Sequence, residues 1–280
     1  MRRLLIRPGG MGDCILALPA LEYLKTEYTE VWTRGDVVPL IRFADRVLSI
    51  ASTGLDLLEL DARELRGALV KRLRTFDSIV SWYGSNRAEF RDCVRSLGLP
   101  FEFLSALPSE SDRMHAADFF LRQVGGRGLA IPRIACRPSQ PGDYAAIHPF
   151  SGSAGKNWSL DLYRETAQRL QMPVQWCAGP EESLDDAVRM DNLWDLAHWL
   201  AAARLYIGND SGITHLAAAV GTPVIAIFGP TDPAIWAPRG DDVRIIHAPL
   251  QSTGVDQVLD VARRLRASAL LPRQGTTSAR

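Results

Sequence analysis

The chain has 280 residues, of which 46% are hydrophobic and 23% are charged, as in an ordinary globular protein. Lys plus Arg and Asp plus Glu each number 32, so the net charge is zero and no overall positive field attracts nucleic acid. The apolar run at the N-terminus ends at Arg7 and Pro8, which is too short for a signal peptide, and no stretch approaches the ~20 apolar residues of a membrane span. We therefore expect a cytoplasmic protein and leave peripheral membrane contact open.

The four cysteines lie far apart in the sequence. Cys14, Cys93, Cys136 and Cys177 form no CxxC pair, so neither a zinc site nor a redox motif is indicated. In a chain of this length, isolated cysteines are typical of free thiols in a reducing compartment.

The first predicted strand runs directly into a glycine turn that carries one acid. Residues 4–7 are apolar up to Arg7, residues 8–13 read Pro-Gly-Gly-Met-Gly-Asp, and apolar residues then recur at helical spacing. This order places Asp13 in the first turn of a helix, at the carboxyl end of a strand, where open α/β sheets bind ligands. An acid at this point also stabilises the helix dipole, so its position alone does not decide between a structural and a catalytic role.

The remainder of the first half alternates strands and helices. We expect strands or extended segments at 30–33, 46–50, 76–82 and 101–107, and helices at 62–73, 86–97 and 112–124. This alternation predicts a parallel sheet with covering helices. Arg87, Arg91 and Arg95 recur at four-residue spacing on the second helix, which indicates either a solvated face or a surface that meets phosphates or lipid headgroups.

A Pro-rich stretch interrupts the pattern and predicts a linker between two domains. Pro132, Pro138, Pro141 and Gly142 lie here, and few of the neighbouring residues look able to pack in a core. We therefore expect domains at residues 1–140 and 141–270, with a disordered tail at 271–280.

The second half repeats the alternation. Strands are expected at 144–149, 174–178, 205–208, 223–228 and 243–246, and helices at 160–170, 196–203, 212–220 and 255–269. The fold class is therefore α/β, with two Rossmann-like domains in one chain. Trp158 and Trp176 are expected in the core.

A second glycine cluster follows the strand that ends at Gly208. Asn209, Asp210 and Ser211 can each cap the next helix, and Gly212 allows close approach of a ligand to its first amides. Free amides and the helix dipole favour an anion such as a diphosphate, to which His215, one turn further on, could donate. The alternative is a well-capped packing helix with a partly exposed histidine.

The loop from Ser151 to Lys156 consists of small residues and ends in a cation. Its amides and the lysine charge suit phosphate, although a lone lysine is more often solvated surface. The loop lacks the Walker spacing, and residues 9–12 lack GxGxxG, which argues against an NAD-dependent oxidoreductase. His148, at a strand end, is expected to be a core histidine.

Glu181 and Glu182 follow another strand of the second half. They fit either an acidic first helical turn or a carboxylate that accepts ribose hydroxyls, and both interpretations stay open.

Several of these motifs together resemble one known family. Residues 10–13 with 18–21, then 148–158, 208–218, 221–223 and 228–233 are similar, in order and spacing, to glycosyltransferase family 9, the ADP-heptose:lipopolysaccharide heptosyltransferases. The resemblance implies the GT-B architecture, in which two Rossmann-like domains face each other across a cleft. The N-terminal half would then hold the acceptor, with Gly10, Met11 and Gly12 on its side, and the C-terminal half the nucleotide sugar.

The same resemblance implies a role for each remaining site residue. Asp13 would be the general base, Ser151 and Lys156 would belong to the phosphate loop, and Glu181 or Glu182 would bind ribose. The diphosphate would lie on four residues of the second glycine cluster: Asp210, Ser211, Gly212 and His215. No metal would be required, although Mg²⁺ near the diphosphate is allowed, and residues 190–194 would lie beside the nucleobase.

The implied activity is an inverting transfer of a sugar, heptose by analogy, from an ADP-linked donor. The acceptor would be a lipopolysaccharide core or another surface glycan, which points to the inner face of the membrane as the place of reaction. A catalytically reduced protein of the same fold that only binds sugar nucleotides or glycans is the alternative.

Overall fold

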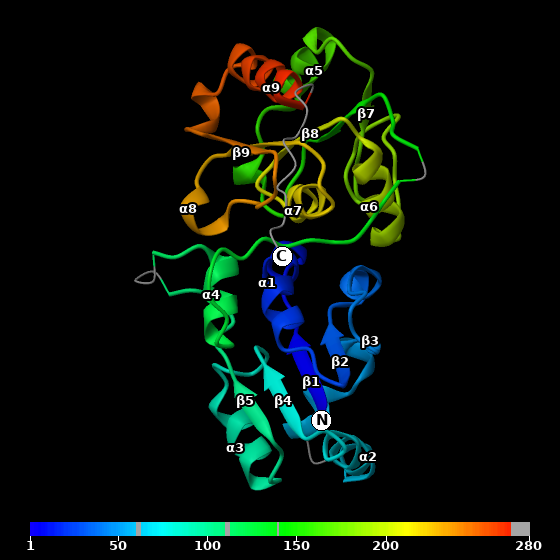
Figure 1. Cartoon of the computed structure of the whole chain (residues 1–280), viewed down its shortest axis with the longest axis vertical. Helices are drawn as coiled ribbons and strands as arrows, with labels where there is room; N and C mark the ends of the chain where they lie inside the picture. The colour runs from blue at the N-terminus through cyan, green and yellow to red at the C-terminus, as the bar shows by residue number, and fades with distance from the viewer. Residues whose placement is uncertain (60–62, 110–112, 139, 270–280) are drawn as a thin grey trace, which may run out of the picture.

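The computed structural model describes residues 1–59, 63–109, 113–138 and 140–269, and within them each half contains one fully parallel sheet (Figure 1). The N-terminal sheet has the order β3-β2-β1-β4-β5. Its strands are β1 (Arg2–Arg7), β2 (Tyr28–Thr33), β3 (Arg46–Ser49), β4 (Ser78–Ser81) and β5 (Phe101–Phe103). Strands β2 and β3 lie on one side of β1, and the chain then returns to the other side of β1 with β4. A crevice therefore opens between the carboxyl ends of β1 and β4.

The C-terminal sheet has the order β10-β9-β8-β6-β7. Its strands are β6 (Ala145–His148), β7 (Val174–Trp176), β8 (Leu205–Asn209), β9 (Val224–Phe228) and β10 (Val243–His247). Here the change of direction lies between β6 and β8, which pair in parallel from Ala145 to His148. The two parallel sheets that the alternation predicts are confirmed.

The helices follow the predicted pattern with shifted ends. They are α1 (Met11–Tyr23), α2 (Arg63–Leu73), α3 (Ala88–Ser96), α4 (Ala116–Gln123), α5 (Leu160–Arg169), α6 (Leu193–Ala202), α7 (Gly212–Ala219), α8 (Pro233–Trp236) and α9 (Val255–Ala269). Short 3₁₀ turns occur at η1 (Gly35–Leu40), η2 (Ile50–Ser52), η3 (Leu55–Glu59), η4 (Ala154–Lys156) and η5 (Leu250–Ser252). None of the helices in the described ranges has the length and hydrophobicity needed to cross a membrane.

Side-chain caps explain two of the shifted helix starts. The His115 side chain accepts a hydrogen bond from the Ala117 amide, so α4 begins at Ala116. Asn192 caps α6 in the same way, so that helix begins three residues before its predicted start at Leu196. The predicted starts at residues 62 and 112 and the predicted tail at 271–280 lie outside the described residues.

The two halves share part of their core. Two buried clusters each lie within a single half. A third contains residues of α1, α4, α6 and α7 and so spans both halves. In Figure 1, α1 extends from the N-terminal sheet toward α7 of the other half. The halves are therefore packed against each other through apolar contact and not merely tethered.

The Pro-rich stretch contradicts one expectation. Ala130, Ile134 and Cys136 are buried in the shared cluster, and the Ile134 amide donates to the Ala219 carbonyl at 2.9 Å. The prediction that few residues here pack in a core is wrong. Prolines disfavour helices and the pairing of strands, but every second side chain of an extended segment can still pack against a core. The predicted domain boundary near residue 140 stays a prediction.

The tryptophans split between confirmation and correction. Trp158 is 1% exposed and lies in the core as expected. Trp176 is only half-buried and packs against the same core cluster from its margin, so its assignment to the core is confirmed only in part. The reason is that β7 forms an edge of its sheet, where one flank of each side chain has no neighbouring strand. Cys14, Cys136 and Cys177 are free thiols, and all three are buried.

Candidate functional site

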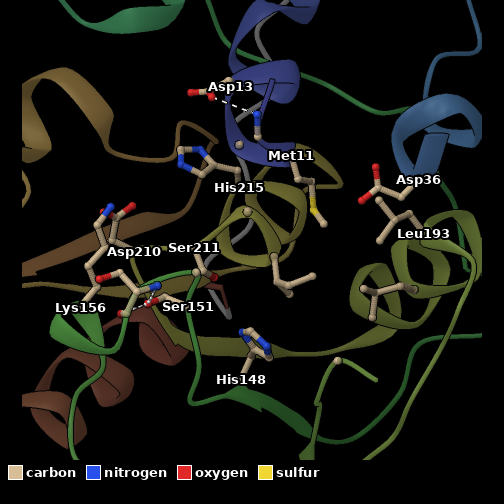
Figure 2. Close-up of a pocket in the computed structure, with 18 of the residues that line it drawn as sticks. Met11, Asp13, Asp36, His148, Ser151, Lys156, Leu193, Asp210, Ser211 and His215 are labelled. Atoms are coloured by element: carbon tan, nitrogen blue, oxygen red, sulfur yellow. Dashed lines mark hydrogen bonds and ion pairs between the residues drawn. The ribbon is translucent and has the colours of Figure 1, made fainter. Parts of the chain in front are cut away.

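A cavity of about 1060 Å³ lies between the two halves, with walls from both. Every predicted site residue lines it except Glu181, which is exposed. Figure 2 shows Asp13 and Met11 of α1 on one side, and Lys156, Asp210, Ser211 and His148 of the C-terminal half on the other. The structure thus brings the two glycine motifs together at one cavity.

Asp13 combines the two roles that the sequence left open. Its Oδ2 accepts a hydrogen bond from the Gly10 amide at 3.1 Å, which caps α1. Gly9, with φ at +147°, makes the turn that brings the two groups together. Oδ1 has no hydrogen-bond partner in the described part of the chain, and the half-buried side chain lines the cavity. One oxygen of Asp13 is structural, and the other is available to a ligand.

Arg7 lies buried next to this turn, and the sequence predicted no role for it. The residue is 2% exposed; its guanidinium donates to the carbonyls of Pro8 (2.8 Å) and Ala106 (3.3 Å) and lies 4.7 Å from the centre of the Phe120 ring. Burial lowers the pKa of Arg7, and nearby Cys14 and Asp13 partly oppose this effect. The residue braces the turn that presents Asp13. A charge at the end of an otherwise apolar strand is the signal that marks it.

The start of α7 lines the cavity at the place where the sequence predicts an anion site. Ser211 is the cap of this helix, with its Oγ accepting from the Thr214 amide at 3.4 Å. Asn209, also considered as a cap, instead holds the phosphate-loop region: its Oδ1 accepts from the Trp158 amide at 2.9 Å, and its Nδ2 donates to the Pro149 carbonyl at 2.8 Å. The first amides of α7 therefore remain available to an anion, with the loop at 151–156 fixed beside them.

The N-termini of α1 and α7 touch at two glycines. A Cβ at Gly212 would lie 2.8 Å from the Met11 Cβ, and a Cβ at Gly12 would lie 3.0 Å from the His215 ring. Both distances are shorter than ordinary contacts, so glycine is what permits this approach. The contact puts Asp13 next to the predicted diphosphate site, as Figure 2 shows.

Lys156 is paired inside the cavity. Its Nζ lies 2.7 Å from Asp210 Oδ2, and the lysine side chain is 35% exposed while that of the aspartate is 9% exposed. The lysine is therefore not a solvated surface residue, which was the alternative interpretation of the sequence. Its charge faces the cavity but is shared with a carboxylate.

His215 is buried within the same wall, and only 6% of it is exposed. Burial lowers its pKa to about 4; His115 and Lys156 add to this shift, whereas Asp210 opposes it. The imidazole is therefore neutral at pH 7 and can donate one hydrogen bond without carrying charge.

The structure distinguishes the two adjacent glutamates. Glu182 lines the cavity, and its Oε2 accepts from the Gly179 amide (2.6 Å) and His148 Nε2 (3.0 Å). Burial raises the pKa of Glu182, but these hydrogen bonds outweigh it and the net shift is downward. His148, expected to be a core histidine, is indeed buried, but it also lines the cavity and contacts an acid. No local signal in the sequence could reveal that contact.

Several apolar side chains also line the cavity. They include Met190 and Leu193 from the segment that the resemblance places beside the nucleobase, together with Ala178 and Leu196. None of Arg87, Arg91 and Arg95 lines the cavity; Arg87 pairs with Glu59, and Arg95 pairs with Asp92 at 2.6 Å on the exposed face of α3.

Comparison with known proteins identifies relatives of this cavity and fold. Residues 109–258 match the model of glycosyltransferase family 9 (heptosyltransferase). Lipopolysaccharide heptosyltransferase 1 of Escherichia coli K12 is 26% identical over 145 residues, covering 46% of this chain and 45% of that relative. The chain thus aligns with about half the length of this curated relative.

Solved structures extend the likeness to nearly the whole chain. E. coli heptosyltransferase WaaC with ADP has a TM-score of 0.71 at 19% identity, covering 95% of this chain and all of that one. E. coli ADP-heptose lps heptosyltransferase II has a TM-score of 0.73 at 15% identity, with 96% and 99% covered. At these identities the likeness shows the fold, and the predicted GT-B architecture is confirmed. Because the family model covers more than half of a chain with this fold, the protein belongs to glycosyltransferase family 9, the heptosyltransferases.

Proposed function

We propose that this protein is an inverting glycosyltransferase that moves heptose from ADP-heptose to the lipopolysaccharide core or another surface glycan. The observation that carries the proposal is the meeting of Asp13, from the N-terminal half, with the α7 N-terminus and Lys156, from the C-terminal half, at one cavity. Relatives solved with ADP and with ADP-2-deoxy-2-fluoro heptose support the choice of donor.

The donor would lie along the C-terminal wall. Its diphosphate fits the amides at the start of α7 and the Lys156 ammonium, and its ribose would meet Glu182. The nucleobase would lie near the apolar side chains of Met190 and Leu193. The acceptor would occupy the opposite side, next to Asp13, where Arg34, Asp36 and Leu107 also line the cavity.

The reaction follows from these placements. An Asp13 carboxylate oxygen takes the proton from the acceptor hydroxyl while that oxygen attacks the anomeric carbon, and the bond from this carbon to the diphosphate breaks. Attack and departure occur on opposite faces, so the configuration inverts. Lys156, the α7 amides and neutral His215 stabilise the negative charge that grows on the leaving ADP.

The cationic groups of the chain make a metal unnecessary in this proposal. Asp210, the acid nearest the proposed diphosphate, already pairs with Lys156. Mg²⁺ bound to the nucleotide would compete with that lysine for Asp210, so we expect chelation by EDTA to leave activity largely intact. We place the reaction in the cytoplasm, peripherally at the inner membrane where a lipid-linked acceptor would be presented.

The decisive experiment replaces the proposed base. With ADP-heptose and a heptose-deficient core acceptor, Asp13→Asn should lower kcat by about a thousandfold, the middle of the range for a general base. The Kd for ADP, measured by calorimetry, should stay within about twofold, because nucleotide contacts come from the other half.

Asp36→Asn is the matched control, since Asp36 is another acid of the N-terminal half that lines the cavity, but it lies next to Leu193, apart from Asp13, and pairs with Arg34 (Figure 2). Its effect on kcat should be about tenfold at most. A normal turnover rate in Asp13→Asn would refute the base assignment. If the wild-type protein releases no ADP from ADP-heptose, either with acceptor present or by slow hydrolysis without it, the alternative of a protein that only binds is favoured.

A further inference from the structure

The two carboxylate oxygens of Glu182 are in unequal surroundings. Oε2 accepts both the Gly179 N–H, at 2.6 Å, and a hydrogen bond from His148 Nε2, at 3.0 Å. Oε1 has no hydrogen-bond partner among the residues described, although the Glu182 side chain is 27% exposed and lines the cavity. One oxygen thus fixes the orientation of the group and leaves the other available to a ligand.

The tautomer of His148 follows from this contact. An ionised carboxylate can only accept, so the proton lies on Nε2 and Nδ1 carries a lone pair. Nδ1 is buried and has no partner in the described part of the chain. An unpaired buried acceptor is tolerated better than an unpaired N–H, which agrees with a neutral ring. His148 is therefore a donor with a single direction, toward Glu182.

Different residues hold the backbone and the side chain of Glu182. Arg189 donates to the carbonyls of Glu182 (2.7 Å), Leu184 (3.1 Å) and Gly179, which fixes the path of the loop without His148. His148 contributes only to the carboxylate end. It ends strand β6, opposite Gly208 of β8, so its backbone is set by the sheet.

We propose that His148 is a positioning residue for donor recognition. By donating Nε2–H to Glu182 Oε2, it turns Oε1 toward the vicinal hydroxyls of the donor's ribose and so makes the site select ribonucleotides over deoxyribonucleotides. This inference rests on the proposed function, because it needs a nucleoside diphosphate in the cavity. A histidine that only filled space would support the binding of both nucleotide types equally.

The test compares ADP with 2′-deoxy-ADP and 3′-deoxy-ADP by calorimetry on the full chain. The wild type should prefer ADP over at least one deoxy analogue by about tenfold, the effect of one hydrogen bond to a charged group. His148→Phe keeps the ring and its contact with Phe150 but removes the donor. In this variant the preference should fall to within about twofold, through weaker ADP binding and with deoxy-nucleotide affinity unchanged.

Two amide variants sharpen the result and do not depend on the folding of His148→Phe. His148→Gln places an N–H near the position of Nε2 and should retain the preference, whereas His148→Asn is too short and should lose it. Glu182→Ala shows how strongly the protein prefers ADP over the deoxy analogues when the carboxylate is absent. His198→Phe, in the same half but outside the cavity, is the matched control and should behave as wild type.

The outcomes separate this inference from the proposed function. If His148→Phe or His148→Asn retains the full preference, or loses affinity for ADP and the deoxy analogues equally, His148 does not position Glu182. A wild type that binds ADP with no preference for ribose also overturns the inference while leaving the donor assignment intact. A wild type that does not bind ADP refutes the proposed donor itself.

Discussion

The two halves of the molecule use the same sheet architecture to present opposite chemistry. Both sheets are parallel, and both open a crevice where the strand order changes, between β1 and β4 in one half and between β6 and β8 in the other. In the N-terminal half the turn after β1 presents the carboxylate of Asp13, whereas the C-terminal half presents helix amides, Lys156 and Glu182. Under the proposed function, sheet topology would set where the ligand binds, and the turn residues would set the chemistry.

Both walls of the cavity carry charges of both signs. On the N-terminal wall, Asp13 and Asp36 line the cavity together with Arg34, and the buried cation Arg7 lies next to the turn that presents Asp13. On the C-terminal wall, Lys156 lines the cavity together with three acids, its partner Asp210 as well as Glu182 and Asp191. What would favour a diphosphate on this wall is therefore local, namely the helix amides at the start of α7 and the Lys156 ammonium, and not the overall charge of the wall.

The largest predicted effect tests whether the halves stay packed. His215 has a folded-state pKa of about 4, against 6.5 as its ordinary value, and Gly12 of the other half covers its ring. Between these pH values the unfolded chain binds the extra proton, so the free energy of unfolding should fall as pH is lowered from 6.5 to 4. The expected loss from this group is about 3 kcal/mol.

Chemical denaturation of wild type and His215→Gln at pH 7 and pH 4 measures this effect. The wild type should lose more stability on acidification than the variant, by about the stated amount, while other acids contribute equally to both. An equal loss in both proteins would mean that His215 is solvated and that the halves are apart in solution.

The next largest effect tests whether the C-terminal half binds the diphosphate. Lys156→Ala removes the cation and leaves Asp210 unpaired beside the diphosphate, so the Kd for ADP should rise about a hundredfold, or roughly 2.7 kcal/mol. Adenosine, which lacks the phosphates, should bind as before. Calorimetry with both ligands provides the measurement.

Two further variants control this prediction. Adding Asp210→Asn to Lys156→Ala should recover part of the ADP affinity, because the uncompensated negative charge is removed. Lys25→Ala changes an exposed lysine outside the cavity and should leave affinity unchanged. Unaltered ADP affinity in Lys156→Ala would remove this residue from the phosphate site.

The smallest effect concerns the ion pair that joins the halves on the α4 side. Arg239 donates to both oxygens of Asp118, at 2.6 and 2.8 Å, and each side chain is less than one-fifth exposed. Arg239→Ala should lower the free energy of unfolding by about 2 kcal/mol, since it leaves a partly buried acid without its cation. Arg133→Ala breaks an exposed pair with Asp241 and should cost less than about 1 kcal/mol. Equal losses in urea denaturation would show that the Arg239 pair is no better shielded than the surface pair.

The sequence predicted well wherever the signal is local. The glycine turn before Asp13, the capped start of α7 and the alternation of strands with helices all depend on residues a few positions apart. The placement of almost all predicted site residues at one cavity follows, because the carboxyl ends of parallel strands meet at the same edge of a sheet. The sequence predicted no role for Arg7, because its contacts with Ala106 and Phe120 join residues that are about a hundred positions apart in the chain.

By itself, the sequence determined the α/β class, the two Rossmann-like halves and the turns that carry Asp13 and Ser211, since backbone preference and hydrophobic periodicity act over short distances. Only the tertiary structure decided that Glu182 and not Glu181 enters the cavity, that His148 holds it, and that the Pro-rich stretch packs into a core shared by both halves. These outcomes depend on which side chains distant strands bring within reach of each other, and that depends on sheet order and on the packing of α1 against α7.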